Sequence, residues 1–427
     1  DEVKRSAMEV LSAMDSALFT EKPELAIISY LKTLRWSLKY GVCNETPRCL
    51  VIYSLMQAML GNLKEGIDAS HLALEMAQQL GVGGTEHDIK DIYAYVLPWK
   101  RPLHVCANKL LQGYTTAIEH GDSYHSFMCL NFYCQFQYFM GNSLSRLEAA
   151  MRQYVRQMED YYQFFLAEAT RMLLQLISNL VGRSSWNLSE LEGEAFSWKV
   201  AMREGRTPKG NTAAMNMYRL QLAVYFNDFE LAASVIKLAL AGVSAIPALA
   251  IVWRNALFVG IASFELYRRG KRRFKSQGLQ ALDQVQKWVD QGNPNVVHLL
   301  YMLQAEKAAI LDRNILKARQ LYDKAIVTAG KSGYFLDRAL ATERCAAMFD
   351  VDKDDYMFQE YIQQAMKAYT EIGCLGKVDA MMDQPRPSLS KASASLDFTD
   401  IIQEGASSQK DTGIESCGIT ATTDAKV

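Results

Sequence analysis

Helical stripes of apolar residues, separated by short polar breaks, run through most of this chain and constrain its fold more than any other feature. Residues 296–313 carry apolar side chains at helical spacing, and the next stretch repeats the pattern and ends at Gly330, as helices often end at glycine. The segment 355–373 behaves in the same way. Alternating Val, Ile and Thr, the pattern of strands, is hard to find. We therefore predict that the body of the chain, residues 1–383, is all-α.

The polar breaks recur at related intervals. Most neighbouring breaks lie about 80 residues apart, and the last two lie about 40 residues apart. Repeat units of about 40 residues would give this spacing if every second turn between helices lacked a recognisable polar break. These breaks begin at Gly61, Gly141, Asn227, Asp312 and Asp350.

Small or apolar residues follow the breaks in an i, i+4, i+7 pattern. In tetratricopeptide-type helix pairs the second helix carries small residues at such positions, because the backbone of its neighbour passes close by. An ordinary amphipathic helix has the same spacing, so it is the agreement with the turn spacing that favours repeats. We predict a tetratricopeptide-like α-α superhelix (a solenoid) of about eight or nine helix pairs. The residues predicted to pack between repeats are Gly66, Ala73, Ala232, Ala239, Ala318, Tyr322, Ala325, Ala365 and Gly373.

The composition changes at residue 384. Residues 384–427 are rich in Ser, Ala, Gly and Pro and poor in aromatic residues, so we expect a disordered tail or truncated linker. One short apolar stretch, residues 396–402, is a candidate helix start and would be marginal alone.

Charge and cysteine content narrow the functional classes. Lys and Arg number 46 against 47 Asp and Glu, so the chain lacks the basic field of most nucleic-acid binders. Eight Cys without close pairs are typical of reduced thiols, which predicts a cytoplasmic protein.

No run reaches 18 apolar residues, so we expect no membrane span. The chain begins at Asp1 with no signal peptide, and we expect it to be a segment of a longer protein.

Three short motifs approach known binding sites and fall short of them. Residues 325–332 have Ala325 in place of the first glycine of a phosphate-binding loop, and they follow a helix instead of a strand. Residues 87–90 resemble a histidine phospho-acceptor box, but acidic residues at a helix start explain them more simply. Asp350, Asp352 and Asp354 alternate like a calcium loop that lacks its glycine and its closing glutamate.

The remaining polar residues do not assemble into a reaction centre. The six His and eight Cys lack metal-ligand spacing, and we find no nucleophile elbow, kinase loop or dinucleotide fingerprint. We therefore expect no catalytic residue, cofactor or metal site in this chain. One dense basic run is most often a solvated loop, with binding of an acidic partner, a lipid headgroup or RNA as the alternatives. Its residues are Arg268, Arg269, Lys271, Arg272 and Arg273.

Residues 333–382 contain several short elements in a fixed order. They are Gly333-Tyr334, Ala339-Leu340-Ala341 with Glu343, the stripe Tyr361, Ala365 and Tyr369, and Gly373 followed by Lys377-Val378. This order resembles the last helix pairs of the repeat region in large multidomain sensor kinases of cyanobacteria, fungi and algae. Where that family usually has W-G-A-x-A-K-V, this chain has I-G-C-L-G-K-V at 372–378.

The resemblance implies a regulatory module. In that family a serine/threonine kinase-like domain and a STAND/AAA-type ATPase precede tetratricopeptide-like repeats, and a GAF domain and often a histidine kinase follow them. The parent would be an ATP-binding protein kinase, and this segment would relay ligand or partner occupancy, with a ligand in the concave face biasing the curvature of the array.

The expected function is a non-catalytic sensing or protein-interaction module whose partner is another protein or a neighbouring domain of the same parent chain. The alternative is a free-standing tetratricopeptide-type adaptor that binds a peptide or helix in its groove. An enzyme and an RNA binder are weaker alternatives, and we expect neither nucleic acid nor membrane as a partner. Nothing in the sequence indicates the oligomeric state.

Overall fold

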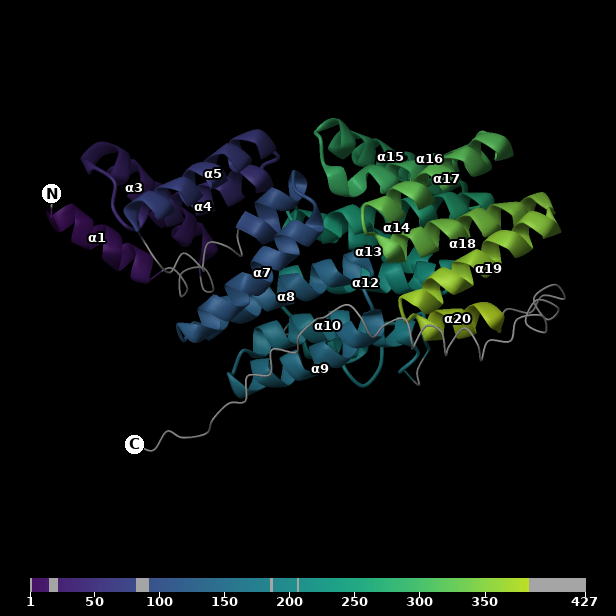
Figure 1. Ribbon diagram of the computed structural model, residues 1–427, viewed down its shortest axis with the longest axis horizontal. Coiled ribbons are helices and arrows are strands. Elements are labelled where there is room, and N and C mark those ends of the chain that lie inside the picture. The colour runs from purple at the N-terminus through teal and green to yellow at the C-terminus, as the bar shows by residue number, and fades with distance from the viewer. Residues whose placement is uncertain (1, 15–21, 82–91, 185–186, 206, 384–427) are drawn as a thin grey trace. The chain divides into compact units, whose positions relative to one another are not determined.

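The computed structural model describes residues 2–14, 22–81, 92–184, 187–205 and 207–383 (Figure 1). The chain divides into two compact units between Met381 and Met382. The predicted disordered tail, with its apolar stretch at 396–402, lies outside the described residues, as does the histidine motif at 87–90.

The described part of the chain is built of helices and contains no strand, in agreement with the predicted all-α class; one isolated bridge joins Glu192 and Ser197. The helices are α1 (Glu2–Ala13), α3 (Pro23–Tyr40), α4 (Thr46–Met59), α5 (Leu63–Leu80), η1 (Ile92–Val96), η2 (Leu97–Trp99), α7 (Leu103–Glu119), α8 (Ser123–Met140), α9 (Leu144–Asp160), α10 (Phe164–Val181), α11 (Trp198–Glu204), α12 (Lys209–Tyr225), α13 (Phe229–Gly242), η3 (Val243–Ala245), α14 (Ile251–Arg268), η4 (Arg272–Phe274), α15 (Lys275–Asp290), η5 (Pro294–Val296), α16 (Val297–Ile310), α17 (Ile315–Lys331), α18 (Phe335–Asp352), α19 (Asp355–Glu371) and α20 (Leu375–Met382).

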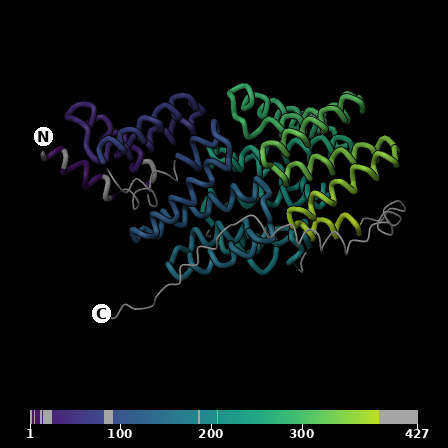
Figure 2. Tube along the Cα trace, in the orientation of Figure 1, coloured from purple at the N-terminus to yellow at the C-terminus, as the bar shows by residue number. Residues whose placement is uncertain are grey.

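Consecutive helices pack as hairpins, and the hairpins stack on one another. The pairs are α4–α5, α7–α8, α9–α10, α12–α13, α14–α15, α16–α17 and α18–α19 (Figure 2). In the stack, α12 contacts α14, α14 contacts α16, and α16 contacts α18. This nearest-neighbour packing confirms the predicted α-α superhelix.

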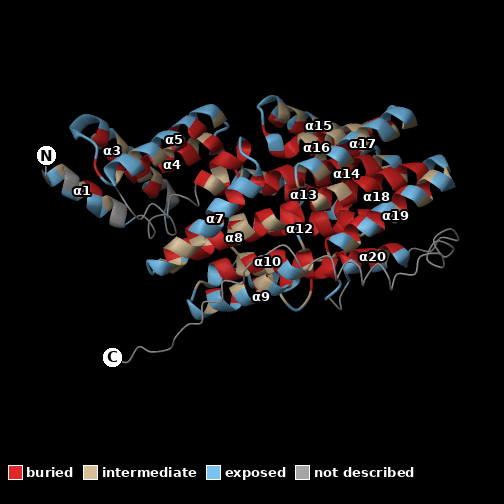
Figure 3. Ribbon diagram, in the orientation of Figure 1, coloured by how far each residue is buried: buried red, intermediate tan, exposed pale blue. Residues whose placement is uncertain are grey.

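The first helix of one hairpin and the second helix of the next hairpin differ in burial. In α14 most residues are buried, including a run from Leu257 to Leu266, because this helix is covered by α12, α13, α15 and α16 (Figure 3). In α17 only Ala318, Tyr322, Ala325 and Ala329 are buried, because that helix exposes its other face.

Four of the five polar breaks lie at turns between helices, and the fifth, which begins at Asp350, forms the end of α18. Asn227 and Arg313 adopt the left-handed conformation, with φ of 58° and 51°. Asp228 then caps α13, accepting a hydrogen bond from the Leu231 amide at 3.0 Å, and Asp354 caps α19 in the same way. Polar residues in these turns therefore cap the helices that follow them.

The C-terminal helices pack against α8, α9 and α10, a contact that the sequence does not predict. The Leu144 amide donates to the Ile372 carbonyl at 2.8 Å. Gly182 and Gly376 meet backbone to backbone, and a Cβ atom built on Gly376 would lie 2.5 Å from the Gly182 Cα. The array thus returns on itself, and α18 contacts α8.

This return fills the inner face of the array around Arg254. The Arg254 guanidinium, with a side chain 3% exposed, donates to Asp337 at 2.7 Å and to the Tyr225 hydroxyl at 2.9 Å, and lies 5.3 Å from the Tyr138 ring. His298 Nε2 lies 2.9 Å from Asp337. Side chains of α8, α12, α14, α16 and α18 therefore fill the space around Arg254.

The charges of this inner network compensate one another. Burial alone would raise the pKa of the Asp337 carboxyl, but the Arg254 charge and the hydrogen bond with His298 outweigh burial, so that pKa lies below its ordinary value. The pKa of Arg254 is raised, because Asp337 and two tyrosine hydroxyls outweigh its own desolvation. Asp337 and Arg254 therefore form a buried ion pair.

Among the described helices, α10 has the length and composition of a membrane-crossing helix, with a mean hydropathy of 1.2 over 18 residues. It packs against α8, α9 and α12, and 72% of this stretch is buried within the array. These contacts are those of a core helix.

Candidate functional site

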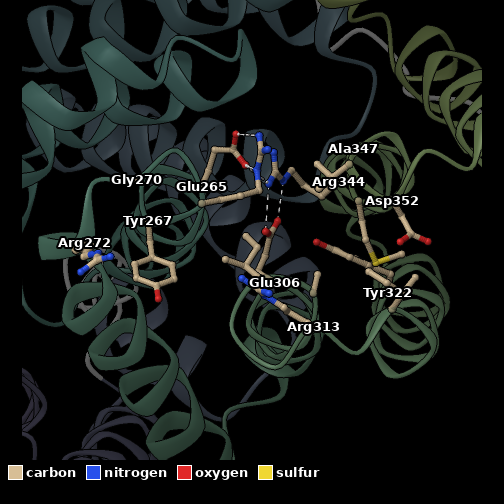
Figure 4. A pocket seen from close by; sticks show the side chains of 16 residues that line it. Glu265, Tyr267, Gly270, Arg272, Glu306, Arg313, Tyr322, Arg344, Ala347 and Asp352 are labelled. Atoms are coloured by element: carbon tan, nitrogen blue, oxygen red, sulfur yellow. Dashed lines mark hydrogen bonds and ion pairs between the residues drawn. The ribbon is translucent and has the colours of Figure 1, made fainter.

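A cavity of about 490 Å³ opens between α14, α16, α17 and α18 (Figure 4). Its size lies within the range of about 300–1,000 Å³ that is common for ligand pockets. Charged side chains form its floor and part of its rim, and apolar side chains line its walls. The apolar wall residues are Ala309, Ile310, Ile315, Ala347, Met348 and Val351.

Arg344 forms the centre of the floor. Its guanidinium donates to both oxygens of Glu306, at 2.6 and 3.1 Å, and lies 3.5 Å from Glu265. All three side chains are at least nine-tenths buried. Desolvation lowers the pKa of Arg344, but the two carboxylates outweigh it and hold that pKa well above its ordinary value. The floor is a fixed ion network, because each buried charge has its partner.

Glu265 links this floor to the basic run. Its carboxylate accepts hydrogen bonds from Arg268 and, at 2.8 Å, from Arg269. Burial alone would raise the pKa of Glu265. Arg268, Arg344 and Arg269 lower that pKa by more than burial raises it, to about 2. The carboxylate is therefore charged throughout the physiological range.

This pKa gives a prediction for stability. In the unfolded chain Glu265 titrates near its ordinary value of 4.5, and in the folded chain at about 2. Ionised Glu265 therefore stabilises the fold above pH 4.5, by about 3 kcal/mol, and this contribution is lost as the pH falls towards 2. We expect Glu265→Gln to lower the urea midpoint at pH 7, with the difference from wild type shrinking between pH 4.5 and pH 2. The exposed Glu360→Gln is the control; equal pH profiles for both variants would contradict the assignment.

The rim carries cations without a partner. Arg272, in the α14–α15 turn, and Arg313, in the α16–α17 turn, are exposed, and no carboxylate pairs with either of them within the described ranges. Asp352 lies on the other side, at the end of α18 (Figure 4). The cavity therefore combines two free guanidinium groups with an apolar wall.

The five cations of the basic run lie in different environments. Arg268 and Arg269 point towards Glu265, and Lys271 donates to Glu230 at 2.5 Å. Arg272 lines the cavity, whereas Arg273 is exposed and lies over the Phe274 ring at 4.9 Å, outside the cavity lining. Of the run, Arg272 is thus the unpaired cation that faces the cavity.

Eight of the nine residues predicted to pack between repeats are buried. Ala73, Ala232, Ala239, Ala318, Tyr322, Ala325 and Ala365 are buried, as is Gly66. A Cβ atom on Gly66 would lie 2.9 Å from the Ser54 carbonyl oxygen, so the spacing of α4 and α5 requires a glycine there. Gly373 lies in a turn at φ 83°, where its carbonyl accepts from Ser145 at 3.2 Å. Tyr322 also lines the cavity.

The other motifs fall in ordinary structural positions. Residues 325–331 form the C-terminal part of α17, and Asp350 and Asp352 belong to α18. The described residues contain no cluster of three or more His, Cys, Asp or Glu able to hold a metal ion. The seven described Cys are buried and unpaired by disulfides.

The sequence pattern did not indicate that the residues of the cavity floor, or Arg313, belong to a site. Glu265, Glu306 and Arg344 stand in apolar helical stretches, which is the signal that a buried charge leaves in a sequence. The pattern does not indicate which residue neutralises each buried charge.

Comparison with known proteins gives no family. No family model and no curated protein matches the chain. Among solved structures the chain is similar to a "circular tandem repeat protein with novel repeat topology and enhanced subunit contact surfaces", at 14% identity over 95% of each chain and a TM-score of 0.18. A TM-score this low supports no conclusion about function.

Proposed function

We propose that this chain is a non-catalytic protein-interaction module that binds an acidic, partly apolar segment of a protein partner in the cavity between α14 and α18. The observation that carries the proposal is a pair of rim arginines, Arg272 and Arg313, with which no carboxylate of the described residues pairs. They border an apolar cavity whose buried floor charges are paired with one another.

The cavity complements such a segment in charge and in polarity. Carboxylates of the segment receive hydrogen-bond donors from Arg272 in one turn or from Arg313 in the other, and planar guanidinium groups suit that contact. Apolar neighbours of the acidic residue then cover Ile310, Met348 and Val351. The floor arginine is already neutralised, so it positions the walls and leaves binding to the rim.

We further propose that the module belongs to a multidomain signalling ATPase or sensor kinase of the cytoplasm, and that it relays partner occupancy to neighbouring domains. The resemblance of residues 333–382 to the repeat segments of that family and the reduced cysteines support this placement. A free-standing adaptor is the second candidate, and it uses the same cavity. An open reading frame encoding an ATPase upstream of Asp1 distinguishes the first from the second.

Peptide binding tests the proposal. A fluorescein-labelled peptide of alternating Glu and Leu is titrated with the protein and followed by fluorescence polarisation, with a Gln–Leu peptide as its neutral counterpart. We expect Arg272→Ala and Arg313→Ala each to weaken binding of the acidic peptide by about 3–10-fold, as for exposed charges. Added salt weakens it further.

Arg273→Ala is the matched control, because Arg273 is the neighbouring exposed arginine and does not line the cavity. Equal binding of the Gln–Leu peptide, or an equal loss in Arg273→Ala, would contradict the proposal.

A further inference from the structure

Four aromatic side chains lie exposed at the turn between α9 and α10. Tyr161, Tyr162, Phe164 and Phe165, here called the aromatic tip, are 52%, 80%, 59% and 46% exposed. A single exposed apolar residue is common, whereas several adjacent ones mark a contact surface. At its other end α10 meets α20 through Gly182 and Gly376, so the aromatic tip lies at the end of its hairpin that is remote from α20 (Figure 1).

The backbone of this turn is held in an unusual conformation. Tyr162 adopts the left-handed conformation at φ 59°, which bulky residues rarely do. In the α7–α8 and α17–α18 turns the corresponding residue is a glycine, Gly121 or Gly333. The Gln163 side chain donates to the Ser123 hydroxyl of α8 at 3.3 Å and ties the turn to its neighbour. The array therefore carries an exposed tyrosine where other turns carry glycine.

Ring contacts order the aromatic tip. Tyr161 packs edge-on against the buried Phe127, with ring centroids 5.5 Å apart. Tyr162 lies edge-on against Phe164, with ring centroids 6.1 Å apart. The exposed aromatic surface is therefore preformed.

The small size of the aromatic tip favours a lipid surface over a second protein. A stable protein interface takes about 20–30 residues from each partner, and the aromatic tip is four side chains of one turn. A membrane interface, by contrast, takes up a few aromatic side chains to a depth of about 5–10 Å. Tyrosine suits that depth because its ring is apolar and its hydroxyl is polar.

The charges around the aromatic tip favour a zwitterionic lipid. Residues 153–171 contain two arginines and three carboxylates, and one of these arginines, Arg171, is paired with Glu159. An anionic lipid therefore meets no excess of cations in this stretch. The faces of tyrosine and phenylalanine rings attract the quaternary ammonium group of choline.

We propose that the aromatic tip binds the headgroup region of a phosphatidylcholine bilayer. The rings of Tyr162 and Phe164 enter the interface, and choline groups lie against the exposed ring faces. A surface contact of this kind needs no spanning segment, so α10 keeps its place in the core of the array. This site is independent of the acidic-segment site proposed above.

Vesicle flotation tests the proposal. The full chain is mixed with large unilamellar vesicles of phosphatidylcholine, and we expect it to float with them. Tyr162→Gly combined with Phe164→Ala is expected to weaken this binding about tenfold or more. Because glycine adopts φ 59° without strain, this variant is expected to keep the thermal midpoint of wild type. Replacing part of the lipid by phosphatidylserine is expected not to strengthen binding.

Tyr356→Ala is the matched control, because Tyr356 is 77% exposed and lies at the start of α19 in another hairpin. It is expected to bind vesicles like wild type. Absence of vesicle binding by wild type, equal losses in both variants, or binding that requires phosphatidylserine overturns the proposal. A dimer that wild type forms and the Tyr162→Gly, Phe164→Ala variant does not, seen by sedimentation velocity without any vesicle binding, replaces it with a protein contact.

Discussion

Replacing Asp337 by Leu is expected to lower the apparent free energy of unfolding by about 3–5 kcal/mol, because it leaves Arg254 buried without its carboxylate. Asp337 joins α18 to α14 through Arg254 and to α16 through His298. The loss of one carboxylate therefore breaks contacts between three hairpins. Urea unfolding followed by circular dichroism at 222 nm measures the effect.

Two further variants separate burial from simple loss of charge. Asp283→Leu removes an exposed ion pair with Lys287 on α15 and is expected to change stability by less than about 1 kcal/mol. Arg254→Met combined with Asp337→Leu removes both buried charges and is expected to recover part of the loss. A loss in Asp337→Leu no larger than in Asp283→Leu would mean that the inner face is open to water.

Gly141→Ala is expected to destabilise the array by about 3 kcal/mol or more. Gly141 has φ 71°, a conformation that costs a non-glycine residue about 1 kcal/mol. An added Cβ atom would also lie 2.4 Å from the Leu336 backbone nitrogen, so α8 and α18 would have to separate. Thermal and urea unfolding report the size of the loss.

Gly121 supplies the matched control at the other end of α8. Its φ is 77°, and a Cβ atom there would meet nothing within 4 Å. Gly121→Ala is therefore expected to cost only the conformational part, about 1 kcal/mol. Equal losses in the two variants would show that the contact between α8 and α18 contributes nothing to stability.

The helical hairpins could be predicted from the sequence, because their signals are local. Ala318, Tyr322 and Ala325 lie on one stripe of one helix, and the spacing alone identifies their buried face. Asp228 and Asp354 mark helix starts, since a capping side chain lies next to the amides that it binds.

The return of the C-terminal helices and the ion networks could not be predicted. Arg254 and Asp337 are 83 residues apart, and no local pattern indicates which carboxylate neutralises a given arginine. The glycines at 182 and 376 lie more than twice as far apart in the sequence, and each alone suggests only a turn. These contacts fill the space around Arg254, and they join residues that are far apart in the sequence.

The candidate site was predicted only in part. The basic run indicated the α14–α15 turn as a binding surface. Where the chain leaves a helix, however, the side chains of adjacent residues point in different directions. Arg269 thus reaches Glu265 and Lys271 reaches Glu230, while Arg272 faces the cavity. Arg313 comes from another turn, and only the packing of α14 and α16 brings it to the same cavity.

The most direct test of the central claim, that partners bind at the cavity between α14 and α18, is hydrogen–deuterium exchange with the Glu–Leu peptide at saturation. Slower exchange is predicted in the two turns that carry Arg272 and Arg313, with little change in the α7–α8 and α9–α10 turns. Slower exchange confined to other hairpins, or none in the presence of bound peptide, would contradict the account.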